Sequence, residues 1–277
     1  MKMGLRFVPP VTLVMAQYAV SIIALSPVFI ILRKRVPKDA GTLVKLVAYS
    51  LLYLVQVALM RFGLVGESSG MAAVLLYAQP LFVLPLAIPF LKEKITLEKT
   101  IGAAVGFAGV LILFLDKMNS LMLNFAAIMV FSAFLWAVET IYYKKFLSHV
   151  DPVISVCFQF LTGTLLLVPL CIITNNFTLP GNWTFILTVL YSSVGSFVVG
   201  WSIWLYLLGK EEATVLSGSS LVVPVIALFI GWLTMGESVG RQSMLGSTLT
   251  LGGVYLVNLM NRRRNNRNRH DGSVSRN

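Results

Sequence analysis

Glu139 is the one acidic residue of this sequence that lies well inside a long apolar stretch. It stands five residues before Lys144, so about 8 Å of helix rise separates its carboxylate from the charged end of the stretch. A carboxylate in lipid is costly, so Glu139 is a functional candidate that would bind a cationic group or take up a proton. The alternative is that it snorkels to the boundary or pairs with a nearby lysine. Ser132, Trp136, Glu139 and Tyr143 follow one another at spacings of 4, 3 and 4, which predicts one stripe along a helix.

Further candidates are aromatic and polar side chains that stand within apolar stretches and would line a polar cavity between helices. Trp201 and Trp204 are three residues apart and share a helix face. The alternative is that aromatic rings anchor at the membrane interface and small hydroxyl residues pack helices together. The predicted cavity-lining, substrate-binding residues are Glu139, Trp136, Tyr53, Gln56, Tyr77, Trp201, Trp204 and Ser217.

Two prolines and one arginine inside apolar stretches are further candidates for a functional role. Pro80 and Pro224 cannot donate a helical backbone hydrogen bond, so each is predicted to be a hinge, with a static kink as the alternative. The carbonyls that they leave unbonded would bind substrate or permit bending. Arg61 stands near one end of its stretch and is expected to reach lipid head groups, with an anionic substrate as the alternative partner.

The composition requires a membrane protein. Hydrophobic residues make up 57% of the 277 positions and charged residues 12%, whereas a soluble globular chain carries about 25% charged residues. The net charge of +11 is distributed in short clusters between apolar spans, which is typical of membrane orientation, so no nucleic-acid partner is expected. Cys157 and Cys171 fall in one span and predict no disulfide, and the sequence has no Cys/His cluster, so neither a metal nor another cofactor is expected.

Membrane-spanning helices must position these candidates. A helix needs about 20 apolar residues to cross the bilayer core, and lipid offers no hydrogen-bond partner to backbone groups that are not paired within the protein. The tail at 261–277 is basic and poor in apolar residues, and is predicted to be disordered. The sequence predicts nine spans, at 11–32, 43–65, 68–91, 99–115, 120–143, 151–174, 183–208, 212–235 and 242–260.

The basic residues predict the orientation of these spans. If each span crosses the bilayer, all but five of the 22 lysines and arginines fall on one side. The positive-inside rule therefore places the C-terminus in the cytoplasm, in a multi-pass protein of the cell (plasma) membrane. The tail run Arg262-Arg263-Arg264, with Arg267 and Arg269, is expected to contact anionic lipid.

The chain repeats itself. At an offset of 144, Glu67 matches Glu211 and Pro80 matches Pro224. The further pairs at this offset are Glu93 and Glu237, Gly102 and Gly246, and Gly109 and Gly253. A second set of positions agrees at an offset of 142. Its pairs are Pro10 and Pro152, Gln17 and Gln159, and Pro27 and Pro169.

The two halves are expected to be inverted repeats, because the loop at 92–94 lies on the cytoplasmic side and its counterpart at 236–238 on the external side. The fold class is thus an all-α membrane protein with nine transmembrane helices in two inverted repeats. The span at 120–143 has its counterpart just ahead of Met1, so the first helix of a duplicated five-helix repeat is expected to be missing. The predicted domains are 1–116, an incomplete four-span repeat, 117–260, a five-span repeat, and the tail 261–277.

The segments 75–113 and 219–257 share a proline within a span, a glutamate at its end, a glycine that opens the next span, and a Gly-Val pair. In both copies this pattern resembles the drug/metabolite transporter superfamily, and in particular its EamA-domain branch of two five-helix repeats. The resemblance extends over residues 5–260. It implies that the corresponding helices of both halves surround a central cavity. The residues that carry it are Pro80, Glu93, Gly102, Gly109 and Val110, and then Pro224, Glu237, Gly246, Gly253 and Val254.

The expected function is therefore a secondary transporter, and specifically an exporter, of a small organic metabolite such as an amino acid or drug-like compound, by alternating access. Its partners are the small-molecule substrate and the lipid bilayer, and a dimer is left open. The alternative is a non-transporting membrane scaffold or an accessory subunit that needs a partner helix. An enzyme is not expected, since no Ser/His or paired-acid constellation occurs on the spans.

Overall fold

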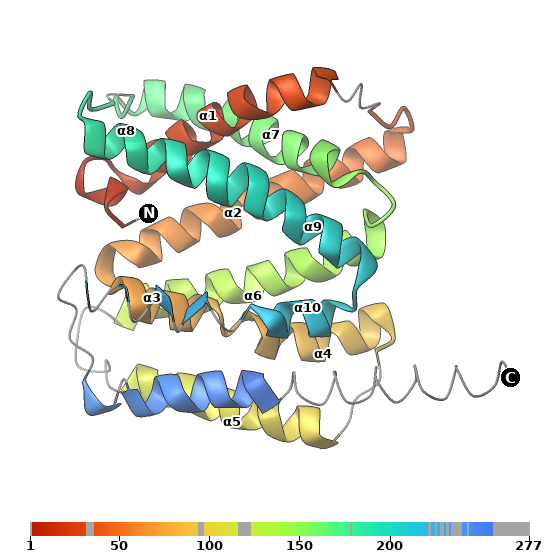
Figure 1. The fold of residues 1–277 in the computed structure, drawn as a ribbon, viewed down its shortest axis with the longest axis vertical. Coiled ribbons are helices and arrows are strands. Elements are labelled where there is room, and N and C mark those ends of the chain that lie inside the picture. Colours follow the sequence, from red (N-terminus) through yellow and green to blue (C-terminus); the bar gives the residue numbers. More distant parts are fainter. Residues whose placement is uncertain are drawn as a thin grey trace, which may run out of the picture. The chain divides into compact units, whose positions relative to one another are not determined.

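The computed structural model describes residues 2–31, 36–93, 97–115, 123–177 and 179–220, together with 223–224, 226–227, 230, 233, 240–242 and 244–256. Within these residues the regular structure is helical throughout, and no strand occurs (Figure 1). The helices are η1 (Gly4–Arg6), α1 (Pro10–Ile31), α2 (Ala40–Gly66), α3 (Ser69–Leu76), α4 (Gln79–Leu91), α5 (Leu97–Leu115), α6 (Leu123–Phe146), α7 (Pro152–Ile173), α8 (Trp183–Leu190), the π-helical η2 (Tyr191–Gly200), α9 (Trp201–Lys210) and α10 (Ala213–Ser219).

Six helical stretches of the described residues are long and apolar enough to cross a membrane, and they coincide with six of the nine predicted spans. They are Pro10–Ile31, Ala40–Gly66, Ser69–Leu91, Leu123–Phe146, Pro152–Ile173 and Trp183–Lys210. Shorter apolar helices at Thr100–Leu113 and Met244–Leu256 match two more predicted spans. The remaining span, 212–235, begins with α10 and is described only in part.

The helices begin where the sequence supplies a cap. The Asp39 carboxylate accepts a hydrogen bond from the backbone N–H of Thr42 at 2.7 Å ahead of α2. Asp151 caps α7 in the same way, and Ser68 and Asn182 cap α3 and α8 with neutral oxygens. Each cap satisfies a backbone donor that a helix leaves unpaired at its N-terminus.

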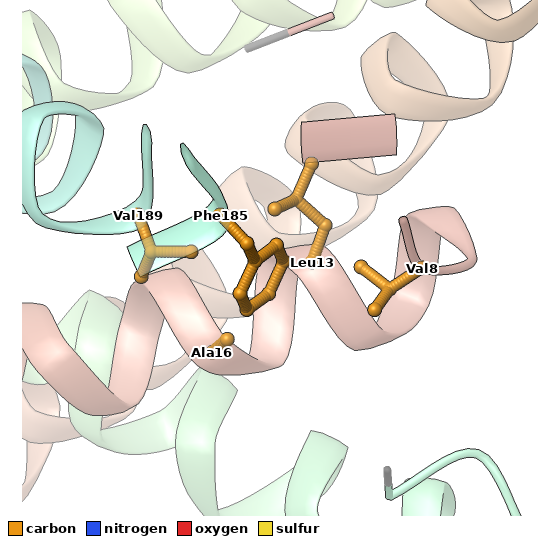
Figure 2. Packing of buried hydrophobic residues seen from close by; sticks show 5 residues of the cluster. All are labelled: Val8, Leu13, Ala16, Phe185 and Val189. Atoms are coloured by element: carbon orange, nitrogen blue, oxygen red, sulfur yellow. The ribbon is translucent and has the colours of Figure 1, made fainter. Parts of the chain in front are cut away.

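The chain forms two compact units, and unit 1 consists of Met1–Val65 and Tyr142–Lys210. In it α1 packs along α7, where a Cβ on Gly163 would come within 2.2 Å of the Tyr18 ring. At the start of α1 a small apolar cluster joins this helix to α8, as Figure 2 shows. Its buried members are Val8, Leu13, Ala16, Phe185 and Val189.

Unit 2 consists of Gly66–Ile141 and Glu211–Asn277. Here α5 meets the helix at 244–256 through glycines. A Cβ on Gly253 would lie 2.3 Å from the backbone nitrogen of Gly106, and one on Gly109 would lie 2.4 Å from the backbone nitrogen of Thr250. Glycine at these positions therefore lets the two helices approach closely.

These compact units are a different division of the chain from the two repeats predicted at 1–116 and 117–260. Each unit takes helices from both halves of the sequence: α1 and α2 join α7 to α9 in unit 1, whereas α3 to α5 join α10 and 244–256 in unit 2. The tail at 261–277 lies outside the described residues.

Candidate functional site

The structure divides the eight predicted cavity-lining residues equally between the two units. All eight side chains are partly or fully buried. Unit 1 contains Tyr53, Gln56, Trp201 and Trp204, and unit 2 contains Tyr77, Trp136, Glu139 and Ser217, together with the two predicted hinge prolines Pro80 and Pro224.

Glu139 lies on α6, and its side chain is only 1% exposed. The alternative in which it snorkels out to the boundary is therefore wrong. Ser132, Trp136 and Tyr143, the other members of the predicted stripe, are buried as well, so this face of α6 is turned into protein. A carboxylate buried within a membrane-spanning helix is uncommon and marks a candidate functional group.

The polar centre of unit 2 is Gln79. Its side-chain amide donates to the hydroxyl of Thr140 at 3.1 Å and to that of Ser217 at 3.3 Å, so it links α4, α6 and α10. Thr140 in turn donates to the carbonyl of Trp136 at 2.8 Å. The side-chain oxygen of Gln79 is buried and accepts no hydrogen bond, which leaves it able to receive a donor.

The predicted break at Pro80 explains how Gln79 reaches this position. The span 69–91 is interrupted at Tyr77 and Ala78, and α4 restarts at Gln79 with Pro80 in its first turn, where a missing N–H costs no helical bond. Pro224 is buried in the corresponding span. Tyr77, at the interruption, packs edge-on against Trp136 with ring centroids 5.3 Å apart.

Glu93 has a structural role, as its position at the end of a span predicts. Its carboxylate accepts a hydrogen bond of 2.6 Å from the hydroxyl of Thr214, which ties the end of α4 to the start of α10. Its repeat partner, Glu237, lies outside the described residues.

The polar centre of unit 1 is Arg61 on α2, whose side chain is 0% exposed. The expectation that it reaches lipid head groups is wrong. Its Nη2 donates to the side-chain oxygen of Gln17 at 3.1 Å, and the Gln17 amide donates to the hydroxyl of Ser192 at 2.6 Å. The guanidinium also lies over the ring of Phe197 at 5.7 Å, which is a cation–π contact.

Aromatic rings from five helices, α1, α2, α7, η2 and α9, form a cluster beside this arginine. Tyr18 stacks on Tyr53 at 6.1 Å, and Tyr53 lies 5.0 Å from Trp201. The indole N–H of Trp201 donates to the side-chain oxygen of Gln159 at 2.9 Å. The remaining contacts of this cluster join Tyr18, Phe160 and Phe197 to one another, Tyr53 to Phe160 and Phe197, and Trp201 to Trp204.

The π-helical stretch η2 supplies two buried hydroxyls of unit 1. Ser192 and Ser193 are both buried in it, and Ser193 donates to the backbone carbonyl of Gln17 at 3.0 Å. Stretches with π-helical geometry are frequent at functional sites. Sequence reasoning missed η2, because its period differs from that of an α-helix while its composition does not.

Sequence reasoning also left Gln17 and Thr140 outside the predicted site. A signal was present for Gln17, which recurs as Gln159 in the repeat. Thr140 had only its position beside Glu139. Within the described part of the chain no cluster of three or more His, Cys, Asp or Glu side chains is placed to hold a metal ion.

Known proteins resemble the chain over nearly its whole length. The profile of the EamA-like transporter family matches residues 1–115 and 124–259. A relative from Archaeoglobus fulgidus, named an uncharacterized transporter, is 30% identical and covers 92% of this chain and 91% of its own. A relative from Salmonella typhimurium, named a probable amino-acid metabolite efflux pump, is 27% identical over 92% of this chain and 87% of its own. A protein solved by crystallography has the same fold, with a TM-score of 0.68 at 16% identity, over 92% of this chain and 90% of that chain.

Proposed function

The chain belongs to the EamA-like transporter family, and we propose that it exports a small amino-acid metabolite across the cell membrane by alternating access. Membership confirms the resemblance drawn from the paired motifs. It also makes the chain a multi-pass membrane transporter and not an enzyme. The substrate class, the direction of transport and the alternating-access mechanism are the content of the proposal.

The observation that carries the proposal is the match with amino-acid metabolite efflux pumps along almost the entire chain. A match of that extent includes the helices that bear both polar clusters, and not only a shared structural half. Secondary transporters of this general kind bind substrate with polar groups buried near the bilayer midplane.

In this proposal Glu139 is the group of unit 2 that binds the substrate ammonium or carries a coupled proton. Its burial at 1% exposure supports that role, because a buried carboxylate binds a cation more strongly than an exposed one does. Gln79 contributes its unbonded side-chain oxygen as an acceptor, and Tyr77 and Trp136 contribute aromatic surface.

Alternating access rests on the two halves being inverted repeats. The bounds of α1 and α7 support the repeat, because Pro10–Ile31 and Pro152–Ile173 are 22 residues each and differ by the offset of 142 found in the sequence. Inverted halves that exchange conformations would open a shared site to one side and then to the other.

The proposed topology follows the distribution of lysine and arginine. It places the C-terminus in the cytoplasm and the arginine-rich tail against anionic lipid of the plasma membrane. Cleavage of the tail by an added protease in inside-out but not right-side-out vesicles would support this orientation.

Solute counterflow tests the function without assuming any energy coupling. Purified protein is reconstituted into liposomes that contain unlabelled L-threonine, L-methionine or L-phenylalanine, and entry of the same labelled amino acid is measured. We expect transient accumulation above that of protein-free liposomes for at least one of them. Absence of counterflow for all three would overturn the proposal and favour the non-transporting scaffold.

A further inference from the structure

Arg61 is a buried cation in a membrane-spanning helix, and the unit around it has no acid to neutralise it. The sequence of unit 1 contains two acidic residues, Asp39 and Asp151. Both accept hydrogen bonds from backbone N–H groups at the starts of α2 and α7. Asp39 precedes Arg61 by 22 residues, which is about 33 Å of helix rise, and the buried Glu67 follows Arg61 by six residues, or about 9 Å, without being among its contacts.

The partners that the structure gives Arg61 are all neutral. They are the side-chain oxygen of Gln17 at 3.1 Å, the sulfur of Met60 at 3.8 Å and the ring of Phe197 at 5.7 Å. The Nε–H of Arg61 is buried and has no hydrogen-bond partner. A guanidinium carries five donors in a planar fork that fits the two oxygens of a carboxylate. Arg61 therefore retains donors for an oxygen ligand.

Gln17 holds the guanidinium in position. Because the Gln17 amide nitrogen donates to Ser192, its oxygen is directed to Arg61. The hydroxyl of Ser192 is itself bonded to the carbonyl of Thr188, so this chain of hydrogen bonds ends on the backbone. Such a fixed donor loses little freedom when an anion binds.

We propose that Arg61 binds the carboxylate of the transported substrate. This rests on the proposed function, which supplies both the substrate and the opening that lets it reach a side chain enclosed in the state described here. Removal of water from the site strengthens the ion pair, and the rings of Tyr53, Phe197 and Trp201 provide apolar surroundings on the same unit. A buried guanidinium without an anionic partner carries a desolvation penalty, and the ion pair with a carboxylate ligand offsets that penalty.

Matched pairs of probes test the proposal. Counterflow of L-threonine, L-methionine and L-phenylalanine is compared with that of their carboxamides, which keep the amine and side chain but lack the anionic group. The proteins are the wild type, Arg61→Met, Arg61→Lys and the control Arg6→Met, which removes an exposed arginine of the same unit. Rates in protein-free liposomes are subtracted throughout.

We expect the wild type and Arg6→Met to favour at least one amino acid over its carboxamide by tenfold or more. Arg61→Met should lower amino-acid counterflow by at least tenfold and change carboxamide counterflow by less than twofold. Arg61→Lys keeps the positive charge but not the planar fork, so its amino-acid counterflow should lie between that of the wild type and that of Arg61→Met. If Arg61→Met is not recovered as folded protein, the preference of Arg61→Lys for the amino acid over its carboxamide is the deciding measurement.

The outcomes separate this proposal from the function on which it rests. Equal loss of both probes in Arg61→Met, an unchanged preference, or a wild type that moves acid and amide alike would overturn the role of Arg61 alone. A wild type that moves none of the probes would overturn the proposed function together with it.

Discussion

Unit 1 and unit 2 both bury polar groups among apolar helices, but the polar centre of unit 1 is a charged side chain and that of unit 2 is neutral. Unit 1 is built around the base Arg61, and unit 2 contains the acid Glu139. In unit 1 the charged group is held by Gln17 within an aromatic cluster. In unit 2 the polar centre is the neutral network of Gln79, which forms where a span is interrupted.

The units also differ in how closely their helices pack. Gly253 of unit 2 faces backbone, whereas Gly163 of unit 1 faces the ring of Tyr18. Backbone atoms cannot rotate away from an added methyl group, but a ring has some freedom to move. The packing of unit 2 should therefore tolerate substitution least.

The largest expected effect is on that packing. Gly253→Ala places a Cβ 2.3 Å from the backbone nitrogen of Gly106 and should lower the free energy of unfolding by about 3 kcal/mol. Gly252→Ala is the matched control, because a Cβ there meets nothing within 4 Å. Denaturant unfolding in detergent measures both. Equal stability of the two variants would contradict the close approach of these helices.

The next effect concerns the hydrogen bonds at the two polar centres. Gln17→Met removes the acceptor of a buried guanidinium and should lower the free energy of unfolding by about 2 kcal/mol. Gln79→Met removes hydrogen bonds between neutral groups only and should lower it by about 1 kcal/mol. In a double-mutant cycle the cost of Gln17→Met should shrink when Arg61 is already methionine. An unchanged cost would show that Gln17 does not support Arg61.

A smaller effect than that of Gln17→Met is expected for the acid of unit 2. Glu139→Gln keeps the size of the side chain but neither binds a cation nor titrates, so counterflow should fall about tenfold, or about 1.4 kcal/mol. Its dependence on pH should disappear at the same time. Glu93→Gln is the control, since Glu93 ties α4 to α10 and is not expected to meet substrate. Unchanged flux and pH dependence in Glu139→Gln would remove this residue from the site.

The smallest effect distinguishes the helix caps of the two units. Hydrogen bonds from the side chain and then the backbone N–H of Thr42 hold the pKa of Asp39 below its ordinary value of 3.8. The cap therefore stabilises α2 above pH 3.8 and loses this contribution as the pH falls through the lowered value. The cap of α3 is the neutral Ser68, which has no such dependence.

Hydrogen exchange at single amides checks this difference. After correction for intrinsic rates, protection of the Thr42 amide should fall as the pH is lowered below 3.8, while that of Met71 in α3 stays constant. Asp39→Asn should abolish the pH dependence, because asparagine caps a helix without titrating. A parallel decline at both amides would indicate general loss of structure and not the cap.

Much of the fold was predictable because membrane helices are encoded locally. Hydropathy identified the spans, and Pro10 and Pro152 marked the starts of α1 and α7. The break before Pro80 and the close packing of Gly109 followed from the backbone chemistry of these residue types. The burial of Glu139 agreed with the position of a lone acid inside an apolar stretch.

The candidate site was predictable only in part. The sequence by itself determined which residues were polar or aromatic inside the spans, because composition and spacing are local properties. Only the tertiary structure decided that Tyr53 and Trp201 belong with Arg61 whereas Tyr77 and Trp136 belong to the other unit. Gln17 meets Ser192 across 175 residues of sequence, and hydropathy does not specify which face of a helix meets which neighbour. For that physical reason the sequence predicted Arg61 at the membrane surface, whereas the packing of helices in the structure buries it.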